Sequence, residues 1–203
     1  MDHHGTPGAP TTTRQGQANR RREPHPCQGP RVAMAGTIAP VTAHPIERRG
    51  RAGDIAALVA PFAVGALGSV PTLRAIPTWY RSLRKPSWNP PDRVFGPVWS
   101  TLYALMGIAL VLVRRAPRAR SDRAQALFGL QLALNLAWSF VFFGNRDLRG
   151  GLAVISLLWV AILATVAEFW RLNRAAALLL LPYLGWVSFA TILNAEVARR
   201  NPA

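Results

Sequence analysis

Five long apolar runs place the strongest constraint on how this chain can fold. They cover residues 55–76, 94–113, 124–143, 152–170 and 175–198. Each is long enough to cross ~30 Å of hydrocarbon as an α-helix, and Gly and Pro interrupt several of them, which membrane helices tolerate. The alternative is a soluble helical bundle, but its helices would show a polar face that these runs mostly lack. We therefore predict an all-α membrane protein, a bundle of five transmembrane helices.

Residues 1–53 differ in composition from the rest of the chain. They are rich in Pro, Gly, Thr and Arg, contain few apolar residues and show no helical period. Such a segment buries too little apolar surface to fold, so we expect a disordered basic tail. It has no apolar stretch of the kind that a signal peptide needs. Met34 is an alternative start, and residues 54–203 form the predicted transmembrane domain.

The net charge of +15 does not indicate a nucleic-acid-binding protein. Eight of the 24 basic residues lie in the tail, and most of the others lie in loops and at the ends of the apolar runs. No basic stripe follows one face of a helix. Cations at the edges of apolar spans are signals of membrane topology and of contact with lipid headgroups. We expect the lipid bilayer as a partner, and no nucleic acid.

Strong metal ligands and deeply placed carboxylates are missing from the predicted spans. The single cysteine, Cys27, and all four histidines lie in the tail. This excludes from the bundle a zinc or copper site and a haem with a His or Cys axial ligand, so we expect no metal site and no obligatory cofactor. The acidic residues lie close to the span ends, which argues against a proton-coupled antiporter. Conventional catalysis is not expected, since no hydrolytic triad or phosphate loop is visible.

Neutral polar and aromatic residues form a stripe on each of three predicted spans, at helical spacing. Broad apolar walls with a few polar groups are typical of a pocket for a flat aromatic ligand. Hydrogen bonding between helices, with no ligand, is the alternative role of the polar residues on the third span. The stripes are Trp99, Tyr103 and Met106 on the second span, Gln131, Asn135 and Trp138 on the third, and Tyr183, Trp186, Ala190 and Asn194 on the fifth.

A ridge of small residues, Gly129, Ala133 and Ala137, lies roughly on the opposite face of the third span. Small residues at every fourth position let another helix approach closely. Two interpretations stay open at this point, which are a homodimer contact and helix packing within one protomer.

The connector between the first two spans, residues 77–91, is unusually rich in rings, prolines and cations. A loop that only joins two membrane helices needs none of them. The prolines restrict the backbone and so lower the entropy lost on closing over a ligand. The cations are Arg81, Arg84 and Lys85, and an arginine binds a carboxylate in bidentate geometry. The connector indicates a lid over a flat, anionic and mostly apolar ligand. The alternative partner of these cations is lipid phosphate.

Four motifs stand in order along the chain. They are Trp79-Tyr80-x-x-Leu83-x-Lys85-Pro86-x-Trp88-x-Pro90-Pro91, Val98-Trp99-x-x-Leu102-Tyr103-x-x-Met106-Gly107, Leu134-Asn135-x-x-Trp138-Ser139-x-x-Phe142-Phe143-Gly144 and Pro182-Tyr183-Leu184-x-Trp186-x-x-Phe189-Ala190-Thr191-x-Leu193-Asn194. In residue types and spacing they resemble the TspO/MBR family of tryptophan-rich sensory proteins and translocator proteins. The resemblance covers residues 55–201, which is nearly everything except the tail.

The resemblance implies a five-helix membrane bundle, commonly dimeric, that binds tetrapyrroles such as protoporphyrin IX and haem, as well as sterols and benzodiazepine-type ligands. It also implies a pocket beneath the first loop, between the first, second, third and fifth helices. Together with Tyr103 and Tyr183 from the stripes, the residues carried over by position form the predicted ligand-binding set. Those carried over are Trp79, Tyr80, Trp99, Asn135, Trp138, Trp186, Ala190 and Asn194.

From this resemblance we expect a tetrapyrrole-binding sensor or regulatory protein. The macrocycle would stack on Trp and Tyr faces, and its propionates would meet Arg81, Arg84 or Lys85. One alternative is a transporter of porphyrin or another small ligand. The other is an enzyme that degrades porphyrin in light, with Trp99 and Trp186 as its redox participants and catalytic candidates.

Overall fold

The computed structural model describes residues 50–202. This part of the chain forms five long helices, α1 (Arg51–Ala75), α2 (Asp92–Arg114), α3 (Arg118–Ser139), α4 (Leu148–Leu172) and α5 (Arg174–Arg200). Two π-helical turns, η1 (Ile76–Tyr80) and η2 (Phe140–Gly144), continue α1 and α3. No strand occurs within residues 50–202. The all-α prediction is confirmed.

All five predicted spans are confirmed, and each helix, counted together with the π-helical turn that continues α1 or α3, extends past the predicted span at both ends. The five candidate spans have mean hydropathies between 1.7 and 2.3. Charged residues end the apolar runs but not the helices. The protein is an integral, multi-pass membrane protein. The predicted tail covers residues 1–53 and includes the alternative start, Met34. Residues 1–49 lie outside the described part of the chain. Residues 51–53, which we predicted as part of the disordered tail, are helical, because α1 begins at Arg51.

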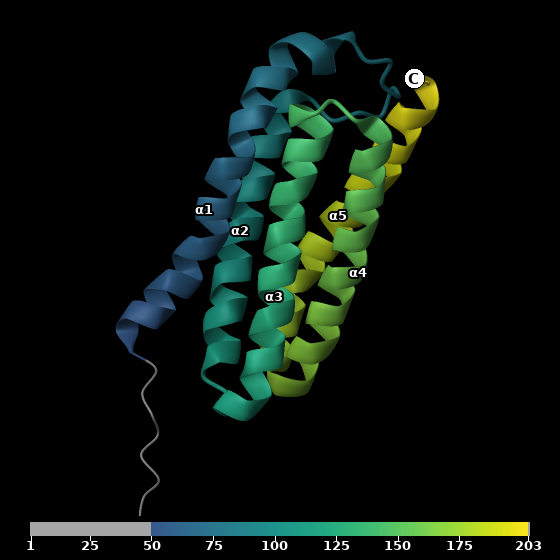
Figure 1. Ribbon diagram of the computed structural model, residues 1–203. Helices are drawn as coiled ribbons and strands as arrows, with labels where there is room; N and C mark the ends of the chain where they lie inside the picture. Colours follow the sequence, from purple (N-terminus) through teal and green to yellow (C-terminus); the bar gives the residue numbers. More distant parts are fainter. Residues whose placement is uncertain (1–49, 203) are drawn as a thin grey trace, which may run out of the picture. The chain divides into compact units, whose positions relative to one another are not determined.

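The helices pack side by side with alternating direction (Figure 1). Their packed pairs close a ring in the order α1, α2, α5, α4, α3, and α2 also contacts α3 across the ring. The interior holds large apolar side chains, and Phe128 of α3 stacks on Phe169 of α4 with ring centroids 6.0 Å apart. Large apolar side chains also cover the outside, where Leu73 is 69% exposed and Ile192 is 62% exposed. An apolar exterior suits contact with lipid.

Close approach and tight turns fix the helix positions. A Cβ on Gly107 of α2 would lie 3.0 Å from the backbone of Leu58, so glycine lets α1 and α2 touch there. Arg146 adopts φ 58° in the turn before α4, and the Asp147 carboxylate then accepts hydrogen bonds from the first N–H groups of that helix. Between α4 and α5 the chain reverses at Asn173 alone, whose side chain accepts from the Ala176 N–H at 3.0 Å.

Candidate ligand-binding site

Both π-helical turns lie at the end of the bundle where the first loop crosses, which we call the lid end. Residues 81–91, the lid, run from η1 toward the C-terminal end of α5 and return to α2 (Figure 1). In η2 the Asn145 N–H donates to the Phe140 carbonyl at 2.8 Å, five residues back. A π-helical turn is wider than an α-helical one and often marks a functional site.

An aromatic cluster, the lid cluster, joins the lid end of α1 to that of α3. Trp79 and Tyr80 in η1 both contact the ring of Phe142, with centroids 5.7 and 6.4 Å away. Trp138 stacks on Phe142 at 5.4 Å, and Phe143 contacts Phe142 at 4.8 Å. The structure therefore brings together three residues of the predicted ligand-binding set.

Sequence reasoning missed the two phenylalanines of the lid cluster as site residues. The signal was present, because Phe142 lies four residues after Trp138 and seven after Asn135, on the same helical face. The predicted set included only Trp, Tyr, Asn and Ala, and it left out rings without a polar atom. Phe142 is 4% exposed and is the ring that the others share.

Asn194 links the lid cluster to the start of α4. The Trp138 indole N–H donates to Asn194 Oδ1 at 3.2 Å, and Asn194 Nδ2 donates to the Leu148 carbonyl at 3.0 Å. Both functions of the Asn194 side chain are thus used within the protomer, and the residue is 3% exposed. Ala190, one turn earlier on α5, is half-buried and packs against the core.

A second group, the inner cluster, lies deeper and joins α2, α3 and α5. The Tyr103 hydroxyl donates to Asn135 Oδ1 at 3.4 Å, and Asn135 Nδ2 donates to the Tyr183 hydroxyl oxygen at 3.2 Å. Trp99 stacks on Tyr103 at 5.4 Å and meets the edge of Tyr183 at 6.2 Å. A Cβ on Gly65 of α1 would overlap the Tyr103 ring, so glycine leaves room for that ring.

Gln131, one turn before Asn135, is 1% exposed. Its Nε2 donates to the sulfur of Met106 at 3.9 Å, while its Oε1 has no hydrogen-bond partner in the described part of the chain. The alternative role of these polar residues, hydrogen bonding between helices, accounts for the Asn135 side chain, which bonds to Tyr103 of α2 and Tyr183 of α5. It accounts for only half of the Gln131 amide.

Trp186 makes no ring contact with the inner cluster within the described residues. Within the described residues its ring contacts are with Phe95 at 5.8 Å and Phe189 at 5.5 Å. Phe189 in turn contacts Trp88 of the lid at 5.8 Å. Trp186 lines an open groove of about 450 Å³ between α2 and α5, the outer groove. Its walls are Pro97, Val98, Thr101, Leu102, Leu105, Pro182, Gly185, Trp186 and Phe189.

The three predicted lid cations have different environments. Arg81 and Arg84 are exposed. Lys85 instead points back into the loop, where its Nζ donates to the Tyr80 carbonyl at 2.9 Å and lies 4.2 Å from the centre of the Tyr80 ring. The Tyr80 hydroxyl also donates to Asn89 Oδ1 at 3.1 Å. Lys85 therefore helps to fold the lid, and the two arginines are the cations left for a ligand.

Most of the small-residue ridge on α3 is uncovered in the protomer. Gly129 and Ala133 are exposed and Ala137 is half-buried. A Cβ built on Gly129 would have no neighbour within 4 Å among the described residues. Packing within the protomer, one of the two interpretations of this ridge, therefore does not involve Gly129.

Comparison with known proteins agrees with this architecture. The model of the TspO/MBR family matches residues 57–200. This chain belongs to the TspO/MBR family. The predicted resemblance is confirmed, and all the residues of the inner and lid clusters lie within the matched region.

Curated relatives of the TspO/MBR family match most of the bundle. The tryptophan-rich protein TspO of Chlorobaculum tepidum is 45% identical over 142 residues, which cover 69% of this chain and 90% of that relative. The tryptophan-rich protein TspO of Archaeoglobus fulgidus is 40% identical over 147 residues, covering 72% and 95%. The human translocator protein is 45% identical over 126 residues, covering 61% and 75%.

Proposed function

We propose that this TspO/MBR protein is a membrane sensor or regulator that binds a tetrapyrrole of the protoporphyrin IX or haem type. The observation that carries the proposal is the convergence of ring faces and exposed guanidinium groups at the lid end. Trp79, Tyr80 and Trp138 gather there beside a lid that exposes Arg81 and Arg84. Flat rings favour a macrocycle, and guanidinium groups favour its propionates.

The inner cluster and the outer groove support the same ligand class. Trp99, Tyr103 and Tyr183 provide aromatic surface in the interior, and Asn135 ties two of them together. The outer groove has the volume of a small-molecule site, whose usual range is roughly 300–1,000 Å³. Trp186 is its indole wall. Tetrapyrrole is a ligand here and no obligatory cofactor is proposed.

Titration of the protein's Trp fluorescence with protoporphyrin IX tests the ring contacts. We expect Trp99→Phe and Trp186→Phe to weaken binding several-fold, because the smaller ring loses stacking worth about 1 kcal/mol. Trp159→Phe is the matched control, because Trp159 belongs to neither cluster and does not line the outer groove. Its indole donates to Ser188 at 2.8 Å between α4 and α5. If the affinity is the same in both test variants as in the unmodified protein, the pocket assignment is wrong.

The dimethyl ester of protoporphyrin IX isolates the role of the lid arginines in the same titration. We expect Arg81→Gln/Arg84→Gln to weaken binding of the free acid roughly tenfold or more, because charge-assisted hydrogen bonds contribute about 1.5–3 kcal/mol. Binding of the ester, which has no carboxylate, should not change. Arg146→Gln, an exposed arginine in the other loop at this end, is the control. Equal losses for acid and ester would exclude propionate pairing.

Transport is the second candidate function, because the human relative is named a translocator protein. Flux of porphyrin into proteoliposomes would distinguish a transporter from a sensor. Bleaching of bound porphyrin in light, absent in Trp99→Phe, would instead indicate photochemical degradation.

We also propose that two copies associate through the ridge of Gly129, Ala133 and Ala137. The exposure of Gly129 and Ala133 supports a contact with a second copy, since small residues at this spacing allow helices to approach closely.

A further inference from the structure

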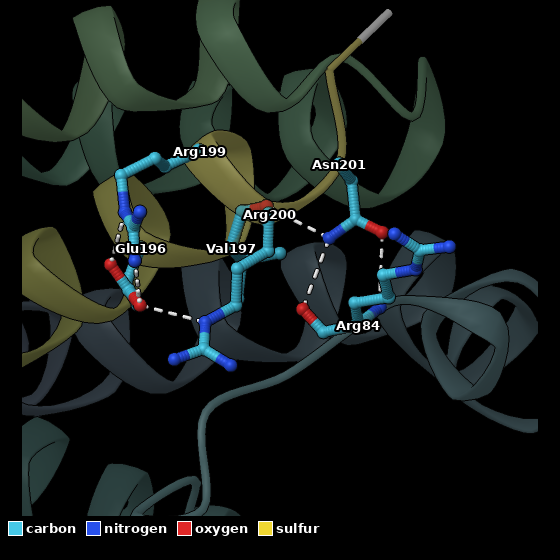
Figure 2. Close-up of polar contacts among 6 residues, drawn as sticks. All are labelled: Arg84, Glu196, Val197, Arg199, Arg200 and Asn201. Atoms are coloured by element: carbon cyan, nitrogen blue, oxygen red, sulfur yellow. Dashed lines mark hydrogen bonds and ion pairs between the residues drawn. The ribbon is translucent and has the colours of Figure 1, made fainter.

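The side chain of Asn201 joins the lid to the end of α5. Asn201, the residue that follows α5, lies against Arg84 in the middle of the lid (Figure 2). The Arg84 backbone N–H donates to Asn201 Oδ1 at 3.0 Å, and Asn201 Nδ2 donates to the Arg84 carbonyl at 3.1 Å. The two residues are 117 positions apart in the sequence. We call this pair of hydrogen bonds the clasp.

The clasp depends on the chemistry of a primary amide. An asparagine side chain offers one acceptor oxygen and two donor hydrogens, so it satisfies both backbone groups of Arg84 at once. Its second N–H hydrogen goes to the Val197 carbonyl at 2.8 Å, in the last turn of α5. The same carbonyl also accepts from the Asn201 backbone N–H at 3.1 Å. These two bonds to α5 hold the Asn201 side chain in the orientation in which it contacts the lid.

The neighbouring arginines do not compete for this position. Glu196 accepts from Arg199 at 2.9 and 2.8 Å and from Arg200 at 2.7 Å, all within the last turns of α5 (Figure 2). The helix end therefore meets the lid through a neutral amide. Because the clasp uses only the Arg84 backbone, the exposed Arg84 guanidinium remains available for a carboxylate.

The other lid contacts show what the clasp contributes. Lys85 and Asn89 bond to Tyr80 and so hold the lid to its own start. Among the hydrogen bonds and ring contacts of residues 50–202, those that join the lid to α5 and its C-terminal residue are the clasp and the ring contact of Trp88 with Phe189 at 5.8 Å. The lid cluster lies on the α1 and α3 side of this end. The clasp is thus a hydrogen-bonded attachment of the lid to the helix that carries Trp186 and Asn194.

We propose that Asn201 is a positioning residue, which holds the lid across the end of the bundle and thereby slows the release of bound ligand. The proposal rests on the proposed function, because release requires a ligand beneath the lid. It adds a residue outside the predicted set, which acts through the backbone of Arg84 and not on the ligand.

Trypsin cleavage after Arg81 and Arg84 measures lid opening without any ligand. In the full chain, we expect Asn201→Ala to raise the rate of cleavage in the lid about tenfold, as expected for the loss of a pair of exposed hydrogen bonds. Asn201→Asp should act in the same direction, because a carboxylate accepts from the Arg84 N–H but cannot donate to its carbonyl. Asn145→Ala, in the other loop at this end, is the control and should not change cleavage.

Stopped-flow dissociation of protoporphyrin IX measures the effect on release. We expect dissociation about tenfold faster in Asn201→Ala, with an unchanged thermal midpoint, because water replaces the two lost hydrogen bonds, which are exposed. A merely structural role would lower the midpoint and leave release unaltered.

The combined results separate the possible failures. Unchanged cleavage would show that the clasp does not hold the lid. Faster cleavage with unchanged release would show that the lid does not retain ligand, and either result overturns the proposal. If the unmodified protein binds no porphyrin, the proposed function fails, and the cleavage assay still decides whether the clasp exists.

Discussion

The two ends of the bundle differ in how they are joined and in what holds them. At the lid end an 11-residue lid, residues 81–91, connects η1 to α2, residues 145–147 connect η2 to α4, and both π-helical turns lie nearby. At the opposite end, the far end, residues 115–117 connect α2 to α3, and Asn173 alone connects α4 to α5. Long loops and π-helical turns often carry the residues that bind a ligand, whereas short connections hold neighbouring helices in fixed positions.

The interactions at the two ends follow the same division. At the far end, Arg114 Nη1 donates to Gln125 Oε1 at 3.1 Å, and Arg114 Nε lies 3.7 Å from the Asp54 carboxylate. Three helices meet through that one guanidinium. At the lid end, rings and neutral amides make the contacts between helices. We infer that the far end fixes the helices and that the lid end recognises the ligand.

The largest expected effect concerns Arg114. The Arg114→Met substitution should lower the free energy of unfolding by about 2 kcal/mol, because Asp54 and Gln125, which are partly buried, lose a charged partner. Binding of protoporphyrin IX should be unchanged, since Arg114 lies at the far end. Thermal unfolding in detergent and the fluorescence titration measure the two quantities. Arg115→Met, at an exposed neighbouring position, is the control. A loss of affinity in Arg114→Met would show that the two ends are coupled.

A smaller effect is expected for Lys85. Lys85→Met removes the hydrogen bond to the Tyr80 carbonyl and the contact with the Tyr80 ring, which together stabilise the local lid structure by about 1 kcal/mol. Tryptic cleavage after Arg81 should accelerate, while the thermal midpoint of the whole bundle stays close to that of the unmodified protein. Arg84→Met is the control, because its backbone keeps the clasp. Equal cleavage rates in the two variants would contradict the assignment of Lys85 to lid folding.

How far the sequence predicts this structure depends on the range of each interaction. The five spans were predictable because each apolar run is continuous. Helical spacing also predicted which residues share a face, and Trp99, Tyr103, Asn135 and Tyr183 do lie together. Spacing does not say which neighbouring helix a face will meet. It predicts one cavity for Trp186, Trp99 and Asn135, and in the structure the Trp186 ring contacts Phe95 and Phe189 and lines the outer groove.

The contact of Asn201 with the lid could not be predicted from the sequence. Asn201 is a single asparagine after a helix, and nothing in its neighbours indicates a bond to a residue 117 positions away. The π-helical turns also change the phase of the side chains that follow, which a period of 3.6 residues does not describe. Lys85 was predicted as a ligand cation, since its sequence neighbours do not show that the Tyr80 carbonyl lies within its reach.

The smallest effect on the protomer is expected at Gly129, on the outer face of α3. Gly129→Leu should raise the free energy of unfolding by roughly 0.5–1 kcal/mol, because leucine favours a helix more than glycine does and a Cβ there meets no neighbour within 4 Å among the described residues. It should also convert a dimer into a monomer, measured by light scattering in detergent with Ala153→Leu on the outer face of α4 as the control. A dimer that persists in Gly129→Leu would exclude the ridge as the interface. If porphyrin affinity falls together with the dimer, ligand recognition is not confined to the lid end of one protomer, because a second copy then contributes to it.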